Sequence, residues 1–211
     1  MPKSYEGQEI IVSFEPKKCI HSRKCAQNAP DIFNVSADGD WIQPDNGDVQ
    51  QSINVANTCP SGAITYKLKN HAANPDIKIN TLHVWENGPL ALRGNLDIAN
   101  QQASQNATLC RCGLSRKKPF CDGAHLKGGF QATGDANSIE SEPLEQTGGQ
   151  VHIKPLENGP LYVTGNLEIC AGSGRLIKRV TKTALCRCGK SNNKPFCDGA
   201  HKATGFSAEG A

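Results

Sequence analysis

Eight cysteine and histidine residues form two sets with the same spacing, Cys-x-Cys-x8-Cys-x3-His. The sets are Cys110, Cys112, Cys121 and His125, and Cys186, Cys188, Cys197 and His201. Thiolate sulfur and imidazole nitrogen are ligands of soft metals, and four of them are enough to hold one metal centre. A disulfide within Cys-x-Cys would close a small, strained ring. The spacing therefore predicts two metal centres, and by itself it fits zinc and an iron–sulfur cluster equally well.

Both sets lie inside a longer internal repeat, which indicates two copies of one domain. Upstream of the cysteines, the sequence Glu-Asn-Gly-Pro-Leu occurs at 86–90 and again at 157–161. We expect three strands in each copy, with an Asn-Gly-Pro turn between the first two. The predicted strands are 81–85, 90–93 and 107–109, and 151–154, 161–164 and 182–185. The second copy has five extra residues around Ala171 to Arg179, which we expect to form a loop.

After the strands, a cysteine loop rich in Gly, Ser, Lys and Pro leads into a short predicted helix that begins near Cys121 and carries His125. Residues four apart share a helix face, so these two side chains can point at one metal. Asp122 occupies the expected N-cap, and Gly123 is expected to let the backbone approach the metal centre. The loops also carry basic residues that we expect to form a solvated rim, with compensation of a negative cluster or docking of an acidic partner as alternatives. They include Arg111, Lys117, Lys118, Arg187, Lys190 and Lys194.

The composition favours several small domains over one large core, since 37% of the residues are hydrophobic and 5% aromatic. The N-terminal residues have no signal-like apolar stretch, and no run reaches the ~20 apolar residues of a membrane span. We therefore expect a cytoplasmic protein without membrane association, in a reducing compartment where close cysteines are more often metal ligands than disulfides. A net charge of +3 and few aromatic residues argue against nucleic-acid binding. The polar segment 131–150 suits a linker between the copies.

Both cysteine loops resemble the CDGSH iron–sulfur domain. They read CRCGLSRKKPFCDGAH at 110–125 and CRCGKSNNKPFCDGAH at 186–201, with alanine in place of the serine in the family name. The resemblance, to mitoNEET-like proteins of the tandem-repeat type, implies one [2Fe–2S] cluster in each copy, held by three cysteines and one histidine. It implies that Cys110 and Cys112 bind the inner iron and that Cys121 and His125 bind the outer one. It also suggests that the two copies pair within one chain as a pseudo-dimer.

A third group of cysteines, Cys19, Cys25 and Cys59, follows Cys-x5-Cys…Cys-Pro. A ferredoxin run places cysteines three apart and closes with Cys-Pro, and here Ser22 stands in the second position. Residues from about 5 to 68 resemble the divergent single-cluster ferredoxin domain. Three thiolates can hold a [3Fe–4S] cluster, or a [4Fe–4S] cluster whose fourth iron takes His21, Ser22 or water. The alternative is that these cysteines are unligated in a degenerate domain.

We therefore predict an α+β protein with three parts: a ferredoxin-like domain at 1–68, and β-rich CDGSH domains at 77–134 and 150–208. The preferred function is electron transfer with a redox partner protein, and the alternative is delivery of the histidine-ligated clusters to apo-proteins. A zinc-bound interaction module is a third possibility. We expect no enzymatic activity, because the chain has no dinucleotide fingerprint, no P-loop and no recognisable catalytic set. We expect a monomer with internal twofold pairing.

Overall fold

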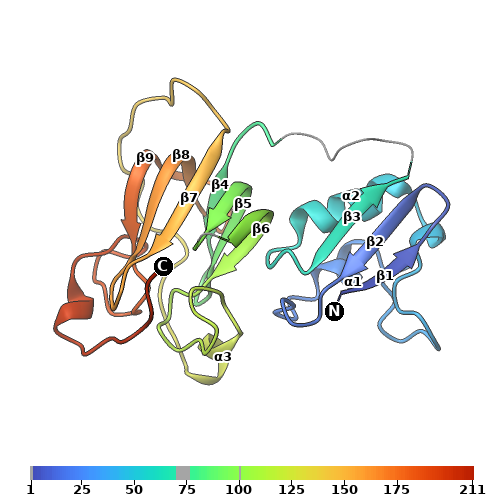
Figure 1. Cartoon of the computed structure of the whole chain (residues 1–211), viewed down its shortest axis with the longest axis horizontal. Helices are drawn as coiled ribbons and strands as arrows, with labels where there is room; N and C mark the ends of the chain where they lie inside the picture. Colours follow the sequence, from blue (N-terminus) through green and yellow to red (C-terminus); the bar gives the residue numbers. More distant parts are fainter. Residues whose placement is uncertain (1, 70–76, 100) are drawn as a thin grey trace. The chain divides into compact units, whose positions relative to one another are not determined.

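The computed structural model describes residues 2–69, 77–99 and 101–211, and the chain divides into two compact units, Met1–Asp76 and Ile77–Ala211 (Figure 1). Both CDGSH-like copies lie in the second unit. Both units are built on sheets with few and short helices, which agrees with the predicted α+β class. No helix in the described ranges is long and apolar enough to cross a membrane.

The first unit is an antiparallel sheet in the order β1-β2-β3 with helices around it. Its elements are β1 (Lys3–Glu6), β2 (Ile10–Phe14), α1 (Lys24–Asn28), η1 (Pro44–Asn46), α2 (Val49–Thr58) and β3 (Ile64–Leu68). Alternation along the strands buries Ile10 and Val12, which pack with Val55 of α2. A capping box between Asp48 and Gln51 begins α2. This small core therefore supports the loops that carry the first three cysteines.

The second unit repeats a three-stranded antiparallel meander, β4-β5-β6 and then β7-β8-β9, each followed by a cysteine loop and a short helical turn. The strands are β4 (Thr81–Val84), β5 (Leu90–Ile98), β6 (Gln101–Leu109), β7 (Gln150–Pro155), β8 (Leu161–Ala171) and β9 (Leu176–Leu185). The helical turns are α3 (Ala124–Lys127) and η2 (Ala200–Lys202). All six predicted strands are present, and the four long ones extend beyond the predicted ranges.

The two copies share one six-stranded sheet, because each short strand pairs with long strands of both copies. In β4, Leu82 lies opposite Leu92 of its own copy in antiparallel pairing and opposite Ile169 of the other copy in parallel pairing. In the same way β7 pairs with β8 and also with β5, where Val151 lies opposite Leu96. All five residues are buried in one core cluster. Separating the two copies would therefore expose apolar side chains of both to water.

The five extra residues of the second copy do not form the predicted loop. Most of 171–179 belongs to strands β8 and β9, and only the four residues between these strands make a turn. The strands of this hairpin are therefore longer than those of the first copy. A hairpin absorbs extra residues at low cost when both strands lengthen together and their backbone groups remain paired.

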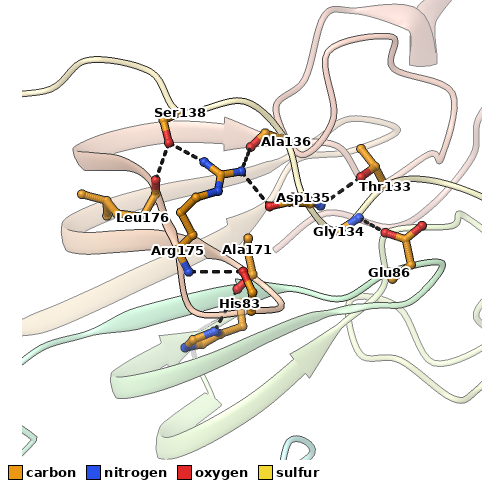
Figure 2. A network of polar contacts seen from close by, with 11 residues as sticks. His83, Glu86, Thr133, Gly134, Asp135, Ala136, Ser138, Ala171, Arg175 and Leu176 are labelled. Atoms are coloured by element: carbon orange, nitrogen blue, oxygen red, sulfur yellow. Dashed lines mark hydrogen bonds and ion pairs between the residues drawn. The ribbon is translucent and has the colours of Figure 1, made fainter.

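The turn of this hairpin holds the segment between the copies. Arg175 forms an ion pair with Asp135 at 2.7 Å and donates to the carbonyl of Ala136 at 2.6 Å and to the hydroxyl of Ser138 (Figure 2). The Ser138 hydroxyl in turn donates to the carbonyl of Leu176 at 2.8 Å. Residues 131–149 contain no helix or strand, as expected of a linker, but this part of it is bound to the second copy.

Candidate metal centres

Each cysteine loop folds back on the strand that precedes it, and this brings its ligands together. The backbone N–H of Cys110 donates to the carbonyl of Pro119 at 2.8 Å, and the N–H of Cys121 donates to the carbonyl of Thr108 at 2.9 Å. The second copy makes the same bonds, from Cys186 to Pro195 and from Cys197 to Ala184. The third cysteine of each set is thus held beside the first although eleven positions separate them.

The four predicted ligands of each copy form two close pairs. In the first copy the sulfurs of Cys110 and Cys112 are 3.7 Å apart, and the Cys121 sulfur is 3.5 Å from His125 Nδ1. The second copy has 3.8 Å for Cys186 and Cys188, and 3.5 Å for Cys197 and His201. A tetrahedral metal bonded to two thiolates at ~2.3 Å separates them by about 3.8 Å, and a thiolate and an imidazole by about 3.5 Å. Each pair therefore fits two ligands of one metal.

These pairs do not form one compact set around a single ion. In the described part of the chain, no three or more of the Cys, His, Asp and Glu side chains are grouped so as to hold one metal ion. The pairs are nevertheless near each other, since the charges of Cys110 and Cys121 interact. Two neighbouring pairs suit a centre with two metals.

Cys121 lies outside the short helix, contrary to the prediction. Helix α3 begins at Ala124, and Gly123 before it has a left-handed backbone with φ of 82°. This turn, rather than a shared helix face, brings His125 to Cys121. A Cβ on Gly123 would meet no protein atom within 4 Å, and the positive φ favours glycine at this position.

Asp122 is not the N-cap but ties the helix to the cysteine loop. Its carboxylate accepts hydrogen bonds from the backbone N–H groups of Ala124 at 3.0 Å and Arg116 at 2.9 Å. Burial alone would raise the pKa of Asp122, but these hydrogen bonds bring it below its usual value. Asp198 does the same in the second copy, with Ala200 and Asn192 as donors.

The three cysteines of the first unit line one small pocket together with Ser22. Cys19 comes from the loop after β2, Cys25 from α1 and Cys59 from the end of α2. Burial raises the pKa of the Cys19 and Cys25 thiols, and the neighbouring Cys59 contributes to both shifts. The structure thus brings together all three residues predicted from the sequence. His21 does not line this pocket, and its Nδ1 lies 4.0 Å from the Cys19 sulfur.

Comparison with known protein families matches both units. Residues 5–69 match the family described as "Divergent 4Fe-4S mono-cluster", and residues 87–126 and 158–202 match "Iron-binding zinc finger CDGSH type". These matches support an iron–sulfur protein built from two kinds of domain. Its two CDGSH copies follow a divergent mono-cluster domain.

The first unit also has relatives of its own. It is 39% identical over 67 residues to "Uncharacterized protein YjdI" of Escherichia coli K12, an alignment that covers 32% of this chain and 87% of YjdI. The protein of the same name from E. coli O157:H7 aligns with the same values. No solved structure matches the chain significantly.

Within each CDGSH copy, backbone N–H groups point at the ligand sulfurs. Leu114 donates to Cys112 at 3.4 Å and Gly123 donates to Cys121 at 3.4 Å. Burial raises the pKa of Cys121 to about 11, and the charge of Cys110 adds to that shift. A thiolate here is unfavourable unless a cation accompanies it, so these sulfurs suit metal ligation better than a free thiolate.

His125 is half-buried, and its Nδ1 faces the Cys121 sulfur, which leaves Nε2 as its other ring nitrogen. Burial, with the positive charge of Arg111, lowers the pKa of His125 against an opposing effect of Asp122. The imidazole is therefore neutral at pH 7, which is the form that binds a metal.

The prediction that Arg111 belongs to a solvated rim is wrong. Its side chain is buried, with 1% of the residue's surface exposed. Its Nε donates to the carbonyl of Gly88 at 2.9 Å and its Nη1 to Thr133 at 2.9 Å. Nη2 donates to Trp85 at 2.6 Å and to Ala132 at 3.1 Å. One guanidinium thus fastens the turn before β5 and the segment after α3 to the Cys-x-Cys stretch.

Arg187 of the second CDGSH copy is buried in the same way and donates to the carbonyls of Gly159, Leu156, Ala208 and Glu209. Burial lowers the pKa of Arg111 to about 10 and also lowers the pKa of Arg187. The charge of Cys186 opposes the first shift and that of Cys110 opposes the second. Each buried arginine therefore lies near enough to a cysteine of the other copy for their charges to interact. The sequence signal for these arginines is only that Cys-Arg-Cys occurs in both copies, and it does not by itself indicate burial.

The two CDGSH sites lie beside each other. A Cβ on Gly113 would come within 2.5 Å of the Cys188 carbonyl oxygen, and one on Gly189 within 2.4 Å of the Cys112 carbonyl oxygen. An open cavity of about 400 Å³ is lined by these four residues and by others from both copies. The close approach of the backbones requires glycine at both positions.

Proposed function

We propose that this protein transfers electrons by means of two [2Fe–2S] clusters, one in each CDGSH copy. The ligands would be Cys110, Cys112, Cys121 and His125, and Cys186, Cys188, Cys197 and His201. The observation that carries the proposal is the division of each set into two pairs whose separations each suit one tetrahedral metal. When bound, such a cluster supplies one-electron redox chemistry.

The two ligand pairs of each site differ in their exposure to solvent. Cys110 and Cys112 are 1% and 8% exposed, whereas Cys121 and His125 are half-buried. The inner pair is thus shielded from water and the outer pair faces the surface. Backbone N–H groups directed at the sulfurs stabilise negative charge on them. With a cluster bound, electrons would be exchanged at the histidine side, because that side is nearer the surface.

We further propose that the two copies act as an intramolecular pseudo-dimer. Support comes from the pairing of β4 with β8 and of β5 with β7, and from the reciprocal approach of Gly113 to Cys188 and Gly189 to Cys112. Two adjacent one-electron sites in one rigid sheet need no second chain to complete them.

The first unit would hold a third cluster on Cys19, Cys25 and Cys59. The shared pocket of these thiols supports this assignment, and Ser22 is one of the side chains lining it that could serve a fourth iron. A [3Fe–4S] cluster would need no fourth protein ligand, whereas a [4Fe–4S] cluster would use Ser22 or water.

A second function, delivery of clusters to apo-proteins, is favoured by the half-buried position of Cys121 and His125. An acceptor protein could reach these two ligands before the inner cysteines. In either function the protein acts on a partner protein and does not turn over a substrate by itself.

Iron and sulfide analysis with EPR of both the oxidised and the dithionite-reduced protein tests the assignment. We expect two [2Fe–2S] centres plus one further cluster, and replacement of Cys25 by alanine should remove the signal of the third alone. Cys170→Ala is the matched control, because Cys170 is buried at 6% exposure in β8 and belongs to none of the three ligand sets. A protein that contains zinc and no sulfide would refute the proposal. Transfer of clusters to an apo-ferredoxin, without electron exchange, would favour delivery.

A further inference from the structure

Positive charge is concentrated on the two cysteine loops and the helical turns after them. Segments 110–130 and 186–206 together contain nine Lys and Arg and two Asp, an excess of seven positive charges. The whole chain has a net charge of only +3, so the remaining residues are net acidic. Two of the nine cations, Arg111 and Arg187, are buried, and the excess therefore comes mainly from residues that solvent or a partner can reach.

The copies differ at the surface although their ligands are the same. Two positions that are leucine in the first copy are lysine in the second, and three that are basic in the first copy are uncharged in the second. The pairs are Leu114 and Lys190, Arg116 and Asn192, Lys117 and Asn193, Leu126 and Lys202, and Lys127 and Ala203. The surroundings of the first site thus contain two leucines and three exposed cations where the second site has mostly neutral or basic polar groups.

The two leucines are unusually accessible for large apolar side chains. Leu126 is 73% exposed and follows His125 directly, and Leu114 is 49% exposed. A Cβ on Gly128 would come within 2.1 Å of Leu114 Cδ1, so Leu114 lies over the end of α3, the helix that carries Leu126. Leu114 also lines the cavity between the copies. Leu126 is therefore next to one residue of the outer pair, and Leu114 lies over the end of the same helix.

Cations surround these leucines. Lys127 is next to Leu126 on α3, and Arg116 lies two residues beyond Leu114 in a loop that Asp122 ties to the start of the helix. Arg116, Lys117 and Lys127 are all exposed. An apolar centre within a charged rim is the usual composition of a protein–protein interface, and a rim of one sign selects a partner of the other sign.

We propose that this surface of the first copy, Leu114, Arg116, Lys117, Leu126 and Lys127, is the docking site of an acidic electron-transfer protein. The proposal rests on the proposed electron-transfer function and adds the charge of the partner and the site at which it binds. The first site is then the one that exchanges electrons with the partner, and the second is reached through the first.

Electron exchange with an acidic ferredoxin of known charge tests the docking surface. We would mix the holo-protein with a reduced acidic plant-type [2Fe–2S] ferredoxin and follow the rate by stopped flow. From 0.02 to 0.5 M NaCl we expect the rate to fall about tenfold or more, since salt screens attraction between opposite charges. Basic cytochrome c, used as electron acceptor, should not be slowed by added salt.

Matched variants in the two copies locate the surface. Leu114→Gln with Leu126→Gln should slow exchange with the ferredoxin about fivefold or more, since central apolar contacts dominate interface energy. Arg116→Gln with Lys117→Gln should slow it and also weaken its salt dependence. The control, Lys190→Gln with Lys202→Gln, should change the rate less than about twofold because rim charges outside the contact contribute little.

The possible failures can be told apart. If dithionite does not reduce the clusters, the electron-transfer function and the docking site are both refuted. If dithionite reduces every variant equally but the first-copy and second-copy variants slow the ferredoxin to the same extent, only the docking site is refuted. The proposal of a protein partner would also be wrong if the wild type bound anionic phospholipid vesicles or duplex DNA as well as it binds the ferredoxin at physiological salt, and if the first-copy variants lost this binding.

Discussion

Gly113 of the first CDGSH copy lies against the backbone of Cys188 in the second, so that a Cβ at position 113 would be 2.5 Å from the Cys188 carbonyl oxygen. Gly113 also has a left-handed backbone with φ of 82°. The same relationship holds in reverse between Gly189 and Cys112. The contact between copies is therefore made by the backbone of the metal-binding loops themselves, directly beside a ligand of each site.

Replacing Gly113 by alanine should separate the two loops. We expect a loss of about 3 kcal/mol of unfolding free energy, from the left-handed backbone and from a clash with backbone that cannot easily move. Denaturant unfolding of the holo-protein measures it. Gly129→Ala is the control, because Gly129 has φ of 61° and open space around its Cβ direction, and it should cost only about 1 kcal/mol. Equal losses would mean that the contact between copies is unimportant.

Arg111→Lys should destabilise the second unit although the charge is retained. Lysine cannot reach the four carbonyls that the guanidinium contacts, and buried carbonyls without donors cost about 2 to 4 kcal/mol in total. Urea unfolding and the retention of iron are the measurements. Arg116→Lys, at an exposed position, should stay within about 0.5 kcal/mol of wild type. A similar effect of both substitutions would contradict the role of Arg111.

Acid should release the histidine-ligated clusters, and His125→Cys should delay this release. Because burial lowers the pKa of His125 in the folded protein, the unfolded chain binds more protons as the pH falls below about 6.5, and stability declines there. A proton on Nδ1 also competes directly with the metal. In the variant we expect the midpoint of colour loss about one pH unit lower, together with a lower reduction potential.

Absorbance against pH and a redox titration provide the two readouts. His201→Cys is the parallel variant in the second copy, and the double variant should show the largest shift of the midpoint. Loss of colour at the same pH in wild type and all three variants would exclude the histidines as the acid-sensitive ligands.

Arg175→Ala should release the segment between the copies. We expect a loss of about 1 to 2 kcal/mol, mainly from the hydrogen bonds to Ala136 and Ser138. The ion pair contributes less, since the Arg175 and Asp135 side chains are 42% and 68% exposed. Limited proteolysis within 131–149 should become faster in this variant. The Asp135→Asn variant should be cleaved almost as slowly as the wild type. Unchanged cleavage of Arg175→Ala would show that other contacts hold the segment.

Local spacing was enough to predict much of this protein. The Cys-x-Cys pair and the four-residue step from Cys121 to His125 correctly predicted which ligands lie close together. Turn signals such as Asn87-Gly88 correctly predicted the strands on either side. These features depend on residues only a few positions apart, so the sequence pattern reports them directly.

Predictions that depended on distant partners were the ones that failed. Arg111 looks like one more charge in a basic loop, and its burial depends on carbonyls more than twenty positions away in either direction. The expected loop at 171–179 became strand because the whole hairpin could lengthen. The helix start was misplaced because Gly123 makes a left-handed turn, which glycine permits but does not require.

The sequence alone was enough to predict the eight candidate ligands in the CDGSH copies, to show their repeat, and to single out the three cysteines of the first unit. Only the tertiary structure decided that β4 and β7 each pair with both copies, that Gly113 meets Cys188, and that each buried arginine lies near a cysteine of the other copy. Ligand types follow from the chemistry of single side chains. The arrangement of the copies follows from burying one shared core, to which residues far apart in the chain contribute together.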